Sequence, residues 1–166
     1  MLRRSVEWCF RQKKGIRLIE PNENLSRVYV KKAESSLHTM DAALQINETD
    51  WVITTAYYAK YFALYALLMK LGIKSEIHDC SIKVAKLLAG HKILAKNLID
   101  EISKAKQMRI ESQYYVTNEL EQTTITKNVK SAHNFLLEIE KALENITTKQ
   151  IEEIRKHLCH IQSSIK

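Results

Sequence analysis

One uninterrupted stretch, residues 50–71 (DWVITTAYYAKYFALYALLMKL), constrains the fold more than any other part of the chain. Small residues recur along it, at Ala56, Ala59, Ala63 and Ala66. Because their spacings follow the turn of an α-helix, the alanines fall on one helical stripe. Small side chains let a second helix approach closely, and bulky neighbours fill the flanks. The stretch therefore predicts the central helix of a tight bundle.

Polar breaks divide the rest of the chain into further amphipathic helices. The 166 residues include three glycines and one proline, too few for many tight turns or a glycine-rich phosphate loop. Apolar periodicity predicts additional helices at about residues 22–44, 76–89, 92–115, 126–143 and 148–161. We therefore expect an all-α protein, an antiparallel helical bundle of about five long helices plus one short helix.

Capping residues mark where these helices should begin and end. Side chains suited to accept the first backbone hydrogen bonds are, in chain order, Asn22 or Asn24, Thr49 or Asp50, Thr124 or Thr126, and Thr147 or Thr148. Gly72 and Gly90 are expected to end the central helix and the short helix.

Basic residues crowd the start of the chain, whose overall net charge is +7. We expect a basic N-terminal arm over residues 1–20, with a short helix around residues 5–13, and one helical bundle over residues 21–166. The arm either reaches RNA phosphates or an acidic partner surface, or it is a mobile solvated tail. A basic balance favours acidic partners such as nucleic acid.

The cysteines and the hydropathy of the chain indicate in which cellular compartment the protein resides. Cys9, Cys80 and Cys159 are odd in number and widely spaced, so they predict no disulfide framework and indicate a reducing cytosol. The apolar stretch at residues 51–73 contains Lys60 and several tyrosines, which favours a buried helix over a membrane span. We expect a cytoplasmic protein without membrane contact; the basic N-terminus lacks the apolar region of a secretory signal.

The segment KQMRIESQYYV is the first candidate site. Arg109 and Gln113 lie four residues apart on one helical face, and Tyr114 and Tyr115 follow near the helix end. An arginine beside aromatic rings can hold a phosphate while a base stacks on a ring. In the alternative interpretation, Arg109 pairs with a carboxylate and the tyrosines pack at the end of the bundle.

The histidines offer little for metal chemistry. They are scattered, and only His157 and His160 share a helix face, which favours a surface pair over a metal site. We expect neither a metal nor a cofactor. Arg155 and His160 form a literal Arg-x4-His pattern, but so short a pattern arises easily by chance in a basic helix.

Several segments together resemble the HEPN family (higher eukaryotes and prokaryotes nucleotide-binding). They are YVKKAESSL, AYYAKYFALYALL, KSEIHDC around His78, RIESQYY, and TITKNVKSAHNFLLEIEKAL, within residues 25–143. The resemblance implies an antiparallel helical bundle whose site is an arginine followed, four to six residues later, by histidine. In ribonuclease members, both protomers of a dimer supply these residues to a metal-independent RNA-cleaving cleft.

This chain departs from the ribonuclease pattern at one position. RIESQYY resembles the Arg-x-x-Ala-Asp-Tyr variant of a small prokaryotic branch related to toxin–antitoxin HEPN proteins, and Tyr114 stands where a ribonuclease would have histidine. With a reference pKa of about 10, tyrosine is a poor general base at neutral pH. The resemblance therefore implies a nucleotide- or RNA-binding or partner module, with binding residues Arg109, Gln113, Tyr114, Tyr115 and His78.

Two other functions remain open. One is a metal-independent HEPN toxin ribonuclease, in which Arg109 and Tyr114 would be catalytic. The other is a purely structural helical interaction protein. The resemblance also implies a homodimer and a minimal nucleotidyltransferase as partner in a toxin–antitoxin-type pair, with Tyr114 or Tyr115 as the residue that accepts a nucleotide.

Overall fold

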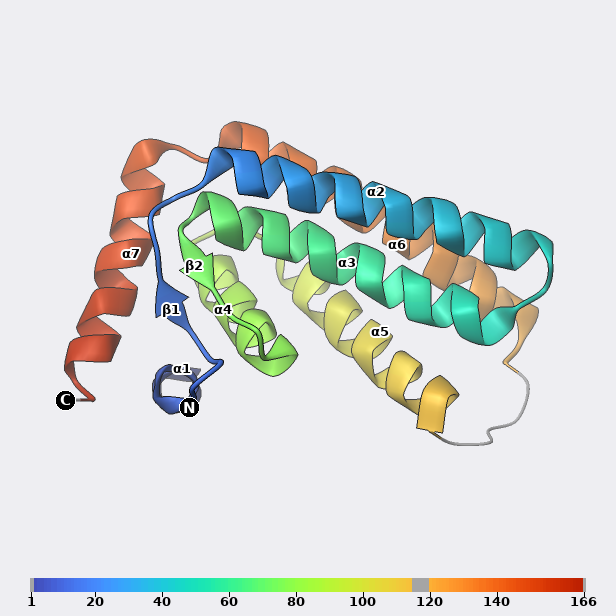
Figure 1. Ribbon diagram of the computed structural model, residues 1–166, viewed down its shortest axis with the longest axis horizontal. Coiled ribbons are helices and arrows are strands. Elements are labelled where there is room, and N and C mark those ends of the chain that lie inside the picture. The colour runs from blue at the N-terminus through green and yellow to red at the C-terminus, as the bar shows by residue number, and fades with distance from the viewer. Residues whose placement is uncertain (1, 115–119, 166) are drawn as a thin grey trace.

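The computed structural model describes residues 2–114 and 120–165 (Figure 1). The elements of this part of the chain are, in order, α1 (Leu2–Arg11), β1 (Arg17–Leu18), α2 (Glu23–Gln45), α3 (Thr49–Lys70), β2 (Ile73–Lys74), α4 (His78–Gly90), α5 (Lys96–Tyr114), α6 (Gln122–Asn145) and α7 (Thr148–Ser163). The predicted all-α helical bundle is confirmed, since the only sheet among these residues is a pair of two-residue strands.

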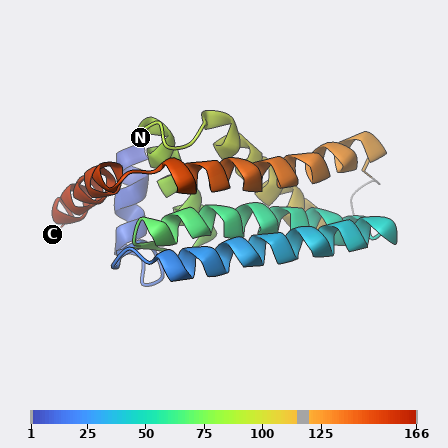
Figure 2. The same ribbon diagram turned by 90° about the horizontal axis from the view of Figure 1, so that it is seen from above.

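Helix α3 is the centre of the bundle. It packs against α2, α5 and α6, and Figures 1 and 2 show α2 and α5 running in one direction and α3 and α6 in the other. The predicted alanine stripe is confirmed, because Ala56, Ala59, Ala63 and Ala66 are all completely buried. Close approach of the neighbouring helices along this stripe explains why a helix so rich in apolar residues is stable in the interior. No helix among the described residues is long and apolar enough to cross a membrane.

Two of the predicted N-terminal caps are confirmed. The side chain of Asn22 accepts a hydrogen bond of 2.8 Å from the backbone of Leu25 at the start of α2. Thr147 and Gln150 form a reciprocal capping box at the start of α7. In both places a polar side chain directly precedes the apolar periodicity, so the local sequence is a sufficient signal.

The other two N-terminal caps were predicted wrongly. Helix α3 begins at Thr49 and α6 begins at Gln122; they are preceded by Glu48 and Glu121, whose side chains form no capping hydrogen bond. At the α2–α3 turn, Asn47 has a φ of 59° and the backbone of Glu48 bonds to Ala43 at 2.9 Å. This tight backbone turn sets the start of α3 without help from a side chain.

The two helix-ending glycines behave differently. Gly72, with a φ of 69°, follows α3 as predicted. Gly90 is instead the last residue of α4, and Lys92 adopts the left-handed conformation two residues later, with a φ of 58°. The short helix therefore ends at Gly90, as predicted, but the left-handed residue that turns the chain is Lys92.

The N-terminal segment packs onto the bundle. Helix α1 contacts α4 and α7, and its residues Val6 and Cys9 are completely buried. Strand β1 then pairs antiparallel with β2, aligning Arg17 with Lys74 and Leu18 with Ile73. The alternative of a mobile solvated tail is therefore wrong for the described residues of this segment.

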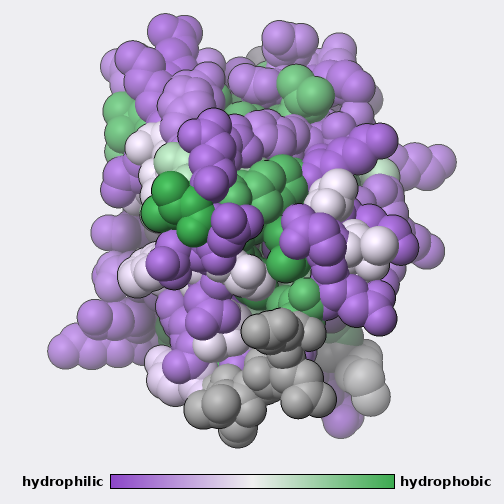
Figure 3. All heavy atoms as spheres, turned by 90° about the vertical axis from the view of Figure 1, so that its right-hand side faces the viewer, coloured by the Kyte–Doolittle hydropathy of each residue, from purple (hydrophilic) through white to green (hydrophobic). Residues whose placement is uncertain are grey.

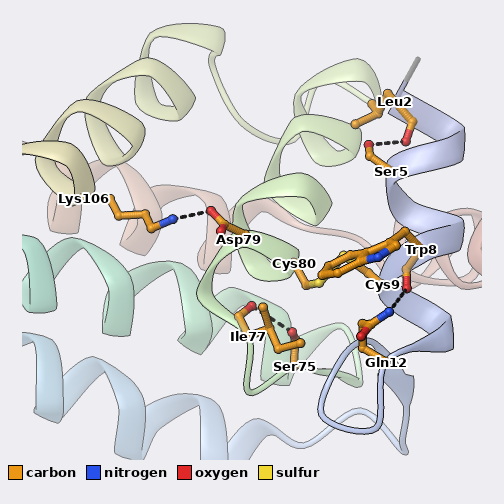
Figure 4. Close-up of a disulfide and its surroundings, with 10 residues drawn as sticks. All are labelled: Leu2, Ser5, Trp8, Cys9, Gln12, Ser75, Ile77, Asp79, Cys80 and Lys106. Atoms are coloured by element: carbon orange, nitrogen blue, oxygen red, sulfur yellow. Dashed lines mark hydrogen bonds and ion pairs between the residues drawn. A yellow bond between two sulfur atoms is a disulfide. The ribbon is translucent and has the colours of Figure 1, made fainter. Parts of the chain in front are cut away.

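A disulfide joins α1 to α4, contrary to the prediction from cysteine spacing. Cys9 and Cys80 are 71 residues apart in sequence, and their Cα atoms lie 5.7 Å apart (Figure 4). Sequence spacing gave no signal, because the pairing depends on how α1 docks on the first turn of α4. The third cysteine, Cys159, is free and exposed.

Candidate functional site

Arg109 of α5 lies over aromatic rings of α3. Its Cζ atom is 5.7 Å from the ring centre of Tyr57 and 5.5 Å from that of Tyr58. Guanidinium groups over aromatic faces are stabilised by cation–π attraction. Its Nε atom is buried and has no hydrogen-bond partner among the described residues. Within the described structure, the charge of the guanidinium is therefore not neutralised, and its Nε–H donor has no acceptor.

His78, the first residue of α4, contacts the same tyrosine from another side. Its Nδ1 atom lies 2.5 Å from the hydroxyl of Tyr57, and its ring stacks on Tyr61 with ring centres 3.9 Å apart. Burial lowers the pKa of His78, and the positive charges of Arg109 and Lys106 lower it further. The imidazole is therefore neutral at neutral pH, whereas burial raises the pKa of Tyr57 and keeps its hydroxyl protonated.

An ion pair fixes His78 relative to Arg109. Lys106, one turn before Arg109 on α5, pairs with Asp79 in the first turn of α4 (Figure 4). A carboxylate at a helix N-terminus also interacts favourably with the helix dipole. The contact ties the start of α4, and with it His78, to the face of α5 that carries Arg109.

The remaining predicted residues lie further along α5. The side chain of Gln113 donates to Thr54 of α3 at 3.4 Å, one turn before Tyr57 and Tyr58. The side chain of Tyr114 is 73% exposed. Tyr115 lies outside the described residues. The structure thus brings Arg109 and His78 together, places Gln113 beside the next turn of α3, and leaves Tyr114 on the surface.

An aromatic strip, defined as Tyr58 and Phe62, continues from Arg109 along α3. The two rings are stacked with centres 5.8 Å apart, and Lys32 of α2 lies 5.4 Å from the Phe62 ring. The strip borders an open groove of about 260 Å³ whose other lining residues carry hydroxyls: Ser35, Ser36, Thr39 and Thr55. A cation therefore stands at each end of a partly exposed pair of rings.

A larger hollow, of about 530 Å³, opens between the α2–α3 turn and the ends of α5 and α6. Figure 3 shows this end of the molecule, with apolar groups gathered between hydrophilic ones. The hollow is lined by three carboxylates, those of Glu48, Asp50 and Glu111. Negative charge repels phosphate, so the size of this hollow does not make it the better anion site.

The literal Arg155–His160 pattern does not form a comparable cluster. Arg155 donates from Nη1 to the backbone oxygens of Ile19, Leu71 and Gly72 at 2.7, 3.0 and 3.1 Å. These hydrogen bonds satisfy carbonyl groups at the end of α3. His160 is exposed. Within the described chain, no group of three or more His, Cys, Asp or Glu residues is placed to hold a metal ion.

Sequence reasoning missed the residues that connect Arg109 with His78. These are Tyr57 and Tyr61 on α3, Asp79 on α4 and Lys106 on α5. The four-residue spacing of Tyr57 and Tyr61, beside that of Tyr58 and Phe62, was a usable signal, because it places two aromatic rows on neighbouring stripes of one helix. The Lys106–Asp79 pair gave none, because it joins two helices.

Two comparisons with known proteins bear on this arrangement. A search of curated proteins finds no match to the chain. A family model described as the HEPN domain matches residues 26–157, from the start of α2 into α7, and this region includes Arg109, His78 and the aromatic strip. At the level of the family, the match supports a nucleotide- or RNA-binding or ribonuclease-type module. Because the match covers most of the chain, the protein belongs to the HEPN domain family.

Proposed function

We propose that this protein binds single-stranded RNA or a nucleotide, with Arg109 holding a phosphate beside the aromatic strip. The observation that carries the proposal is the guanidinium over Tyr57 and Tyr58 with a buried, unpaired Nε. A buried donor without a partner costs about 1–3 kcal/mol. A phosphate oxygen would remove that cost and meet the charge, as arginine commonly does with phosphates.

The aromatic strip supports a nucleic-acid ligand over free phosphate. Proteins that bind single strands combine basic groups along the backbone with aromatic rings on which bases stack. Tyr58 and Phe62 supply the rings, and Lys32 supplies a second cation at the far end. The neighbouring hydroxyls of Ser35 and Thr39 offer partners for a ribose or a base edge.

Fluorescence anisotropy with a labelled single-stranded RNA tests the proposal. We expect Arg109→Ala to weaken binding about tenfold or more, and Arg109→Lys to restore part of the affinity. Arg27→Ala is a matched control, because the exposed Arg27 side chain contacts Glu23 on its own helix at 3.7 Å. Equal dissociation constants for wild type and Arg109→Ala would contradict the proposal and favour a purely structural role.

A second candidate, a metal-independent ribonuclease, is supported by the position of His78. A neutral imidazole near an arginine is suited to take the proton of a ribose 2′-hydroxyl as that oxygen bonds to phosphorus. The bond from phosphorus to the 5′-oxygen of the next nucleotide breaks, which leaves a 2′,3′-cyclic phosphate and a 5′-hydroxyl that takes its proton from water, while Arg109 stabilises the charge on the phosphate. We assign this role to His78 and not to Tyr114, whose phenol is a poor base and is largely exposed.

An RNA-cleavage assay separates this candidate from binding alone. The ribonuclease predicts cutting that persists with a chelator and is lost in both Arg109→Ala and His78→Gln. If concentrated wild-type protein binds RNA without cutting it, binding is the function. If cutting survives in His78→Gln, the assignment of His78 as base is wrong.

We further propose a homodimer and a minimal nucleotidyltransferase as partners. The exposed phenol of Tyr114 supports the second, because a modifying enzyme can reach it. Incubation with a minimal nucleotidyltransferase and ATP should add one nucleotidyl group, detected by intact mass and lost in Tyr114→Phe. Sedimentation equilibrium tests the dimer, for which a purely monomeric species would be the contrary result.

A further inference from the structure

A third cavity, a pocket of about 280 Å³, lies between α1, α4 and α7 and shares no lining residue with the Arg109 cluster. These three helices meet at one end of the molecule (Figure 1). Helix α1 lies outside residues 26–157, the region matched by the family model. The pocket is therefore built in part by a segment that the family match does not include.

The floor of this pocket is apolar. It is formed by Val6 of α1, Leu87 of α4 and Ile161 of α7, which are all buried, and Leu2 closes one side. Gly90 also lines the pocket, and a Cβ atom added there would meet no atom within 4 Å. Gly90 is exposed, so a side chain added there would enter the open space of the pocket without displacing another atom.

The rim of the pocket is basic. Arg3, Lys86, His91 and His157 line it, and Nε2 of His91 lies 3.0 Å from Nδ1 of His157. The described lining residues include no carboxylate. Arg3 has one acidic neighbour, Glu7, at 3.1 Å, on the same helix. An apolar floor under a positively charged rim is complementary to a molecule with an apolar chain and an anionic head.

We propose that this pocket binds a free medium-chain carboxylate, with its hydrocarbon chain on the apolar floor and its carboxylate at the basic rim. The pocket is slightly smaller than the roughly 300–1,000 Å³ of typical ligand sites, which suits one unbranched chain. A membrane surface would need a broad apolar helix face. Val6 and Cys9 of α1 are buried, and its exposed Trp8 has the Lys83 ammonium 4.6 Å from the ring centre.

The histidine pair makes this binding pH-dependent. Burial lowers the pKa of His157, and the charges of His91, His160 and Arg3 lower it further; Lys86 faces it from α4. A bound carboxylate favours the protonated imidazole, so affinity should increase as the pH falls below the ordinary imidazole pKa of about 6.5.

Isothermal titration calorimetry with octanoate tests the proposal on the full chain. Gly90→Leu is the decisive variant, because its side chain fills the open space while leucine suits a helix better than glycine does. We expect saturable octanoate binding by wild type and a loss of about tenfold or more in Gly90→Leu, with no loss of thermal stability. His157→Gln should weaken binding about twofold to fivefold at pH 6.

His38→Gln is the matched control, because His38 is exposed on α2 and does not line the pocket. It should bind octanoate as wild type does. Octanol, which lacks the charge, should bind about tenfold more weakly than octanoate. Three results would overturn the proposal: no saturable binding of octanoate, unchanged affinity in folded Gly90→Leu, or equal affinity for octanol. Tight binding to anionic vesicles that octanoate does not compete would also overturn it, in favour of a membrane surface.

Discussion

At the scale of the residue, Arg109 differs from a structural arginine in what surrounds it. Arg155 gives its hydrogen bonds to three backbone oxygens, whereas Arg109 rests on two rings and its Nε has no partner among the described residues. Cation–π contacts contribute about 0.5–2 kcal/mol, which partly offsets the loss of water around the guanidinium. They leave its donors available, and this is why we place ligand binding at Arg109 and a structural role at Arg155.

The electrostatic effect of Arg109 on His78 can be measured directly. Burial is the main cause of the lowered pKa of His78, and the charge of Arg109 is the next. Arg109→Gln should therefore raise the pKa of His78 toward its ordinary value, without restoring it fully. A two-dimensional NMR titration of the imidazole protons measures this, with Arg27→Ala as the control that leaves the pKa unchanged. No change in Arg109→Gln would mean that the two side chains are not electrostatically coupled.

At the scale of the element, the C-terminal end of α3 is fixed by contacts from distant parts of the chain. Gly72 has a φ of 69°. A Cβ atom there would lie 2.3 Å from Nη1 of Arg155 and 2.4 Å from the backbone oxygen of Ile19. The glycine thus allows both the left-handed turn and the close approach of the arginine that caps α3.

Gly72→Ala should destabilise the protein by at least about 2 kcal/mol, because it adds left-handed strain and displaces Arg155. Gly90→Ala is the matched control. It lies in helix α4 with open space around it, so we expect it to be neutral or to stabilise by up to about 1 kcal/mol. Urea unfolding measures both free energies; similar values for the two variants would contradict the role given to Gly72.

The disulfide makes a second element-scale prediction. It closes a long loop, since Cys9 and Cys80 are 71 residues apart, and it holds α1 against the first turn of α4. Cys9→Ser should lower the free energy of unfolding by about 2–4 kcal/mol without reductant. Cys159→Ser, which changes an exposed free cysteine, should have little effect. If reductant leaves the stability of wild type unchanged, the disulfide does not form in solution.

At the scale of the whole molecule, local signals predicted more of the fold than of the site. The alanine stripe of α3, Asn22 and Thr147 each identify an element from adjacent residues, because helix periodicity and capping are local. The Cys9–Cys80 pair and the contact between His78 and Tyr57 join residues on separate helices. Their positions depend on how the helices pack, which one sequence does not specify at the level of single contacts.

A buried lysine links three helices in the middle of the bundle. Lys60 of α3 is 2% exposed and donates to Ser131 of α6 at 2.9 Å, and Ser131 in turn donates to Glu101 of α5 at 2.7 Å. Burial lowers the pKa of Lys60 to about 8, although the charge of Glu101 opposes the shift. The network gives the ammonium hydrogen-bond acceptors, but the charge is held in the interior at an energetic cost.

This cost predicts how stability changes with pH. The unfolded chain binds a proton at Lys60 up to its ordinary pKa of 10.5, whereas the folded protein releases it above about 8. The free energy of unfolding should therefore rise between these values and fall as the pH is lowered through 8.

The buried tyrosines have the opposite effect on stability, but at higher pH. Burial raises the pKa of Tyr61 to about 12, whereas tyrosine in the unfolded chain ionises near pH 10. Tyr61 therefore lowers the free energy of unfolding only as the pH rises above about 10. Urea unfolding between about pH 8 and about pH 9.5 isolates the lysine. Lys60→Met should lose the rise in this window, and a slope equal to that of wild type would show that Lys60 keeps its ordinary pKa in the folded protein.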